Sequence, residues 1–219
     1  NQLAAHMDYH TPGALDLVTR FWATDSLRPT LPEGPGYKAV ELFEAIERGE
    51  IKALWVMATN PAISLPDAAR VRAALEKCPL VIVSECAAHT DLLPYADIVL
   101  PASGWSEKDG TVTNSERRIS RQRGMLPPPG EAHHDWWIMC EVAKRLGFTE
   151  AFNYAHPWEI FDEHAKLSGF ENGSVPGSPQ RLFDISGLTG LGREGYDALA
   201  PIQWPVTKAA PHGTARLFE

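Results

Sequence analysis

The amino-acid sequence predicts an α/β protein in which an open parallel sheet is flanked by helices and followed by a helical appendage. Helical patterns and short apolar segments alternate between residues 37 and 147, as they do in parallel βαβ units. The apolar segments are nearly continuous, which indicates strands covered on both faces. Many Gly and Pro residues interrupt residues 148–219, which is typical of an irregular extension.

The elements follow in regular order. A helix is predicted over residues 37–50, where Val40, Phe43 and Ile46 lie on one face and Gly49 suits the C-terminal cap. The remaining predicted elements are a strand within 51–59, a helix over 65–77 with Pro66 near its first turn, a strand over 79–85, a short helical crossover over 88–95, a strand over 96–102 and an amphipathic helix over 134–147.

The sequence divides into three predicted regions. Residues 1–36 are expected to connect from a preceding domain, since a short helical pattern over 13–24 runs into a Pro/Gly-rich linker over 28–36. Residues 37–147 form the α/β domain. Residues 148–219, with helical pieces over 156–167 and 179–186, lead towards a C-terminal domain that is absent. The first residue is not Met, and the chain is predicted to be a fragment of a longer polypeptide.

Composition narrows the function classes. The chain has 219 residues, of which 44% are hydrophobic, and a net charge of -8. Such a length allows one large or two small cores, and the acidity argues against binding to nucleic acid or to a membrane surface. The sequence has no apolar run of transmembrane length and no signal-peptide pattern. Cys78, Cys86 and Cys140 form no C-x-x-C pair, so we expect buried thiols in a reducing cytoplasm and no metal site.

Polar residues follow each predicted strand. Asn60 comes after the first strand, Ser84 and Glu85 end the second, and a polar, charged segment over residues 103–123 follows the third. The carboxyl ends of parallel strands meet at one edge of a sheet, where open α/β folds bind ligands. The sequence therefore predicts a binding site at that edge.

Asn60, Glu85 and Lys108 each have two interpretations. Asn60 offers an amide to a ligand, or forms an ordinary Asn-Pro turn. Glu85 stands where such folds place an acid on ribose hydroxyls, and a carboxylate also accepts from the N1–H and N2–H edge of guanine; alternatively it is a solvated strand end. Lys108 suits a diphosphate, or pairs on the surface with Glu107 or Asp109.

The residues around the last helix complete the candidate set. Asp135 is a predicted N-cap whose other oxygen remains available to a ligand. The arginines at positions 117, 118, 121 and 123 offer anion contacts or an ion-paired face. His133 and His134 are adjacent and cannot share one helical face as metal ligands would. Since there is no G-x-G-x-x-G after the first strand and no nucleophile–base set, the residues indicate a cradle for an anionic, nucleotide-bearing ligand, with no catalytic residue in this chain.

Residues 51–75 and 81–148 closely resemble assimilatory nitrate reductase catalytic subunits, members of the molybdopterin oxidoreductases (the dimethyl sulfoxide reductase family). The resemblance is most specific over SGWSEKDGTVTNSERRISRQR, residues 103–123, and implies the Rossmann-like third domain of these enzymes. It also implies a bis(molybdopterin guanine dinucleotide)-molybdenum cofactor, which the polar segment helps to hold.

Five positions match the family's cofactor contacts: Asn60, Ser84, Glu85, Lys108 and Asp135. At position 85 the family pattern has Asp, and the extra methylene of Glu moves the carboxylate. Arg117 and Arg118 match the family's Glu-Arg-Arg and are assigned a supporting role.

The resemblance implies that the parent enzyme reduces nitrate to nitrite by oxygen-atom transfer to molybdenum, using an external electron donor and the remaining domains of the same polypeptide. The family's 4Fe-4S cysteine cluster and its molybdenum-ligating Cys are not in this chain, which is therefore expected to be inactive alone. The alternatives are a related enzyme such as formate dehydrogenase and a cofactor-free scaffold, as in the large subunit of respiratory complex I. A free-standing guanine-nucleotide module lacks its phosphate-loop motif here.

Overall fold

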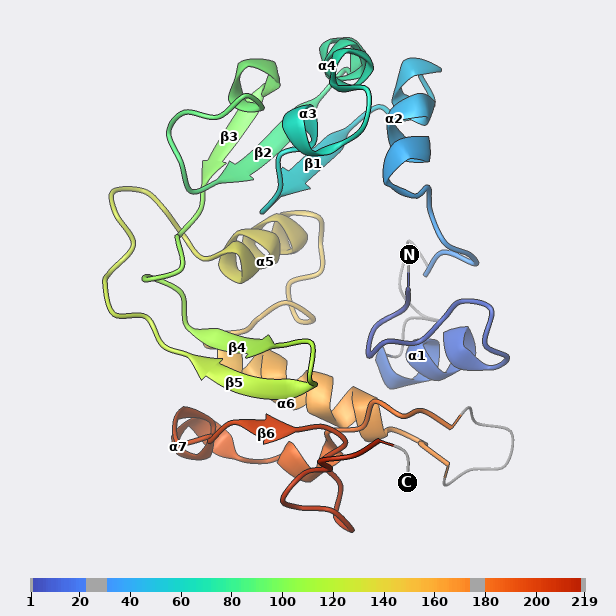
Figure 1. Cartoon of the computed structure of the whole chain (residues 1–219), viewed down its shortest axis with the longest axis vertical. Helices are drawn as coiled ribbons and strands as arrows, with labels where there is room; N and C mark the ends of the chain where they lie inside the picture. Colours follow the sequence, from blue (N-terminus) through green and yellow to red (C-terminus); the bar gives the residue numbers. More distant parts are fainter. Residues whose placement is uncertain (1, 23–30, 174–179, 218–219) are drawn as a thin grey trace. The chain divides into compact units, whose positions relative to one another are not determined.

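A computed structural model describes residues 2–22, 31–173 and 180–217. The chain divides into two compact units (Figure 1). Unit 1 comprises Asn1–Pro35, Asp109–Gln122 and Tyr154–Glu219, and unit 2 comprises Gly36–Lys108 and Arg123–Asn153. This division differs from the three predicted regions, because 109–122 groups with unit 1. Parts of the predicted helix over 13–24, the linker over 28–36 and the helical piece over 179–186 lie outside the described residues.

Unit 2 contains the predicted parallel sheet. Its strands are β1 (Leu54–Met57), β2 (Val81–Glu85) and β3 (Ile98–Pro101), in the order β1-β2-β3. Both pairings are parallel, so all three strands run the same way (Figure 1). The parallel sheet with flanking helices is confirmed.

The helices of unit 2 lie within the predicted helical segments, except for one short helix after β1 that was not predicted. They are α2 (Ala39–Glu47), α3 (Pro61–Ser64), α4 (Ala68–Lys77), the 3-10 helix η2 (Leu93–Tyr95) and α5 (Asp135–Arg145). Gly49 has a φ of +76° just after α2, a conformation that favours glycine. The helix predicted over 65–77 begins only at Ala68, because Asp67 caps it by accepting a hydrogen bond from Arg70 N.

The core of unit 2 lies on one face of the sheet. Alternate β1 and β2 residues pack together with side chains of α2 and α4, the cluster including Phe43, Ile46, Leu54, Val56, Val71, Leu75, Val81 and Val83. Ile98 and Val99 of β3 are 44% and 47% exposed, so the prediction that every strand is covered on both faces is wrong for β3. The reason is that β3 is an edge strand in the described part of the chain.

Unit 1 contains a second, antiparallel sheet. Strands β4 (Gly110–Thr113) and β5 (Arg118–Gln122) form a hairpin, and β6 (Ile202–Gln203) pairs with β5. The segment over 103–123, predicted as a loop, therefore contains two strands. The error has a physical cause. A half-buried hairpin with charged side chains lacks the apolar run by which a strand is recognised, and Ile119 is the one apolar residue of β5.

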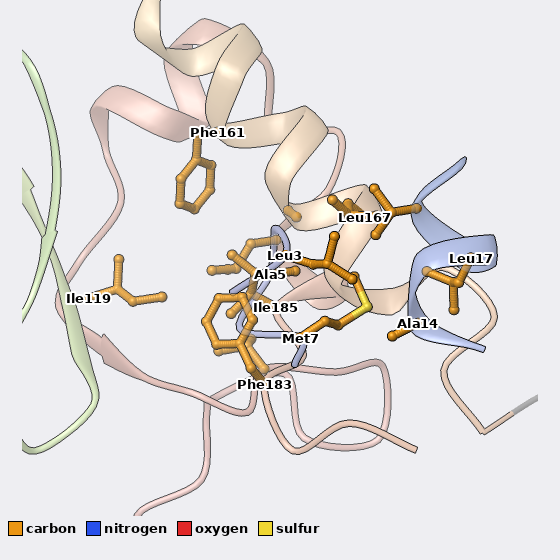
Figure 2. Close-up of a cluster of buried hydrophobic side chains, with 14 of the residues drawn as sticks. Leu3, Ala5, Met7, Ala14, Leu17, Ile119, Phe161, Leu167, Phe183 and Ile185 are labelled. Atoms are coloured by element: carbon orange, nitrogen blue, oxygen red, sulfur yellow. The ribbon is translucent and has the colours of Figure 1, made fainter. Parts of the chain in front are cut away.

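Helices complete the described part of unit 1, and its core draws on distant parts of the chain. The helices are α1 (Ala14–Trp22), α6 (Pro157–Gly169), η3 (Ser186–Leu188) and α7 (Gly192–Asp197). Figure 2 shows the apolar cluster, in which Leu3 and Met7 lie among side chains of α6 and of the segment before η3. Ile119 of β5 belongs to the same cluster. The N-terminal segment, predicted as a connector, thus contributes to this core. Among the helices of the described ranges, none has the length and apolar character that a bilayer crossing requires.

Candidate functional site

The site residues predicted from the sequence all belong to unit 2 and follow the carboxyl ends of its strands. In the register of the sheet, Met57 lies opposite Ser84, and Glu85 lies opposite Pro101. Asn60 follows β1, and the segment 103–108 follows β3. The parallel register brings these positions to one edge of the sheet, where helix α5 also begins.

Lys108 and Asp135 meet directly at this edge. Lys108 Nζ lies 2.6 Å from Asp135 Oδ2, and the two side chains are 31% and 24% exposed. The predicted alternative, a surface ion pair of Lys108 with Glu107 or Asp109, is wrong: Glu107 accepts from Gly104 N at 2.6 Å, and Asp109 pairs with Arg121. The structure therefore joins two of the five candidates in a half-buried, charge-assisted contact.

Asp135 is not the N-cap of α5. Helix α5 starts at Asp135, and the extended backbone of His134 makes that residue the N-cap, without a side-chain capping bond. The His134 ring is instead engaged, since its Nδ1 lies 2.9 Å from Ser103 Oγ, a fully buried group. In the first turn, the Asp135 carboxylate still lies favourably at the positive end of the helix.

Backbone bonds fasten the segment after β3 to the start of α5. Ser103 N donates to His133 O, and His133 N donates to Pro101 O, at 2.9 and 3.0 Å. With the contacts of Ser103 and Lys108, the segment is attached to the helix at both of its ends. Lys108 is thereby held in place by more than its own ion pair. The Ser103–His134 contact has no sequence signal, because a buried Ser and a surface Ser cannot be told apart in a polar segment.

Gly124 lies close to the backbone of the segment that carries Lys108. A Cβ on Gly124 would lie 2.9 Å from Glu107 O, closer than real side chains approach a backbone oxygen. Ser106 O accepts from Met125 N and Leu126 N at 2.7 and 3.1 Å. Residues 124–126 thus support the segment that carries Lys108.

Ser84 and Asn60 are both turned towards protein. Ser84 is 3% exposed, and its Oγ accepts from the indole Nε1 of Trp55 at 2.9 Å. Asn60 occupies the N-cap position of α3 without a side-chain capping bond, and its Oδ1 is buried with no hydrogen-bond partner. A buried acceptor without a partner costs about 1–3 kcal/mol, which makes Asn60 an unusual feature of this edge.

The Glu85 carboxylate folds back onto its own chain. Its Oε1 accepts from Cys86 N at 2.8 Å and from Ala87 N at 3.1 Å. Burial raises the pKa of the Cys86 thiol, a hydrogen bond to Glu85 raises this pKa further, and the charge of Lys108 acts in the opposite sense.

The arginines of the charged segment belong to a different part of the structure. Arg117, with a φ of +68°, donates to the carbonyl oxygens of Trp204, Thr214 and Ala215. Arg118 pairs with Glu116 at 2.9 Å. Both lie in unit 1, where they brace the hairpin, in keeping with the supporting role expected of them. Within the described ranges, no group of three or more His, Cys, Asp or Glu side chains is arranged to hold a metal ion.

Comparison with known proteins connects this geometry with one family. A family model described as molybdopterin oxidoreductase matches residues 4–145. The chain is 55% identical over 207 residues to a nitrate reductase of Klebsiella oxytoca, and 45% identical over 212 residues to one of Shewanella frigidimarina. These matches cover 94% and 97% of the chain but only 23% and 22% of the relatives.

Other matches broaden the range of activities and support the fold. The alpha subunit of an F420-dependent formate dehydrogenase from Methanocaldococcus jannaschii is 39% identical over 153 residues, which is 69% of the chain and 22% of that subunit. Among solved structures, acetylene hydratase from Pelobacter acetylenicus matches with a TM-score of 0.52 and 20% identity, over 73% of this chain and 24% of that one. The structural likeness supports the fold alone.

Proposed function

Because the chain belongs to the molybdopterin oxidoreductase family, we propose that the sheet edge of unit 2 holds part of a bis(molybdopterin guanine dinucleotide) molybdenum cofactor in a nitrate reductase. The observation that carries the proposal is the Lys108–Asp135 contact of 2.6 Å, which unites a cation and a carboxylate beside two strand ends. The chain spans less than a quarter of the length of its nitrate reductase relatives, so the activity proposed is that of the whole polypeptide.

The side chains present suit the chemistry of a guanine dinucleotide. Lys108 offers a point charge to a diphosphate, and its half-exposed position leaves the ammonium accessible. Asp135 offers an acceptor for N–H or O–H donors of the nucleotide. Asn60 has a buried oxygen without a partner in the protein, so a small adjustment of the amide on binding would gain a hydrogen bond that the protein alone lacks.

The role of this chain is to bind and to orient. The cofactor, when bound, supplies the oxygen-atom transfer that converts nitrate to nitrite, and the protein supplies position and electrostatics. Lys108 would neutralise phosphate charge, while the segment 103–108, fixed by Gly124 and Ser103, would hold that charge in one place. None of the five residues is assigned a proton transfer, since the proposal gives them binding and positioning roles only.

The remaining features of the parent are part of the same proposal. A 4Fe-4S cluster, the molybdenum ligand, nitrate binding and the contact with the electron donor are assigned to other regions of the polypeptide, in a cytoplasmic enzyme. Formate oxidation is the second candidate, because the formate dehydrogenase of M. jannaschii is 39% identical over most of this chain. The greater identity to nitrate reductases, 55% and 45%, favours nitrate.

The test uses the complete gene product, produced with the cofactor pathway active. Molybdenum and acid-released GMP are measured per chain, and viologen-driven nitrate reduction is assayed in the same sample. We expect molybdenum, two GMP per chain and nitrite formation. Molybdenum and GMP without nitrite would transfer the proposal to formate, whereas the absence of both would indicate a scaffold.

Lys108→Ala provides the residue-level test. It removes a charge-assisted contact to the diphosphate, worth about 1.5–3 kcal/mol, so we expect molybdenum and GMP contents to fall together at limiting cofactor. Lys52→Ala, at an exposed lysine of the same unit, is the matched control and should leave both contents unchanged. Equal contents in the two variants would remove Lys108 from the site.

A further inference from the structure

The Glu85 carboxylate is committed to its own turn through one oxygen. A carboxylate oxygen has two lone pairs, and Glu85 Oε1 accepts from both Cys86 N and Ala87 N. Both bonds are of ordinary length, 2.8 and 3.1 Å. Both are charge-assisted, because the acceptor is a carboxylate. Oε1 therefore has no lone pair left for a ligand.

This commitment limits what Glu85 can recognise. A carboxylate reads the N1–H and N2–H edge of guanine with two oxygens side by side, one for each donor. Resting on the proposed function, we infer that Glu85 is a positioning residue that fixes the turn after β2, and that it does not read the guanine edge.

The same bonds determine where phosphate can bind. Successive backbone N–H groups after a strand commonly form an anion-binding nest, and here the first two such groups after β2 already donate to Glu85. The Glu85 carboxylate also places a negative charge beside these two N–H groups. The end of β2 is therefore closed to phosphate, and the anion contact is assigned to Lys108, whose Nζ pairs with Asp135.

The resemblance implies an Asp at position 85, and Glu has one methylene more. In this chain the Glu85 carboxylate accepts from the backbone N–H groups of the next two residues.

Two substitutions separate positioning from direct recognition. Glu85→Gln keeps an oxygen for Cys86 N and Ala87 N but replaces the second oxygen by an NH2 group, which cannot accept from guanine. Glu85→Ala removes both bonds. The complete polypeptide would be purified from a host without the cofactor pathway, and GDP and IDP would be titrated by calorimetry, since inosine lacks the N2 amino group.

We expect Glu85→Gln to bind GDP within about threefold of wild type and to keep the wild-type ratio of GDP to IDP affinity. Glu85→Ala should weaken GDP and IDP by the same factor, about three- to tenfold, because two hydrogen bonds of the turn are lost. Amide hydrogen exchange at Cys86 and Ala87 should be slow in wild type and in Glu85→Gln, and fast in Glu85→Ala.

The possible failures are distinguishable. If Glu85→Gln abolishes the preference for GDP over IDP while Lys108→Ala weakens both nucleotides, Glu85 reads guanine and the inference is wrong, but the proposed function stands. Rapid exchange of both amides in wild type would also overturn the inference, since the turn would not be held. If wild type binds neither nucleotide, the proposed function fails, and the inference fails with it.

Discussion

Replacing Arg121 should destabilise unit 1 far more than replacing the neighbouring Arg118. The Arg121 side chain is only 2% exposed and pairs with Asp109 at 2.6 Å and with Asp197 at 3.1 Å. Its guanidinium also lies 3.8 Å from the centre of the Tyr196 ring, and burial raises the pKa of that tyrosine to about 12. Arg121→Met retains the aliphatic stem and removes these contacts.

The magnitude follows from the burial of the partners. Breaking a fully buried ion pair costs about 3–5 kcal/mol, because the remaining charge has no partner. Asp109 and Asp197 are 31% and 46% exposed, so water stabilises them partly and the electrostatic loss falls to about 1–2 kcal/mol. The contact with the Tyr196 ring adds about 1 kcal/mol. The total expected for Arg121→Met is about 2–3 kcal/mol.

Urea unfolding, together with hydrogen exchange of the β5 amides, measures this loss in unit 1. With a denaturant slope of about 1–3 kcal/mol per molar urea, the midpoint should fall by about 1–2 M. Arg118→Met is the matched control, since the exposed pair with Glu116 contributes at most about 1 kcal/mol. Equal losses in the two variants would refute the reasoning from burial.

Two further predictions concern the loop geometry and the response to pH. Gly124→Ala should push the Glu107 backbone away and weaken GDP binding, measured by calorimetry, about tenfold. Gly36→Ala is the control, since Gly36 has open space around it, and it should bind GDP normally. An unchanged affinity in Gly124→Ala would show that the segment 103–108 need not be fixed. Burial, and after it the charge of His6, lowers the pKa of His164 below its ordinary value of 6.5. Unit 1 therefore has the full stability contributed by neutral His164 above pH 6.5, and it loses this stability as the pH falls below 6.5. His164→Phe should reduce the loss of unfolding free energy between pH 7.5 and 5.5, and His212→Gln, at an exposed histidine, should not; equal pH slopes would contradict the assignment.

The sheet edge was predictable because its signals are local. A short apolar run predicts each strand, and the polar residue after the run predicts where the strand ends. These two signals assign Asn60, Glu85 and Lys108 to one edge of the sheet without knowledge of any contact. The parallel order then follows from the helical segments between the strands. The fold class needed nothing more than this periodicity.

Partners in space were not predictable in the same way. Lys108 has acidic neighbours at 107 and 109, and sequence proximity favoured those over Asp135, which actually binds it. Asp135 itself was misplaced by one position, since His134 has the extended backbone of an N-cap and Asp is much the better capping residue by type. The hairpin β4–β5 was missed because its strands carry charged residues that make ion pairs within unit 1.

Burial distinguishes Lys108 from Arg121 within one charged segment. The chain passes from unit 2 to unit 1 between Lys108 and Asp109, and each of these residues is ion-paired within its own unit. Arg121 is enclosed, with two carboxylates and an aromatic ring around it, so exchanging these partners for a ligand would require unit 1 to open. The side chains of Lys108 and its partner Asp135 are 31% and 24% exposed. A diphosphate could therefore approach the Lys108 ammonium without any rearrangement of a core. Of these two residues, the accessible lysine is therefore the one suited to a ligand, and the enclosed Arg121 is suited to holding the fold.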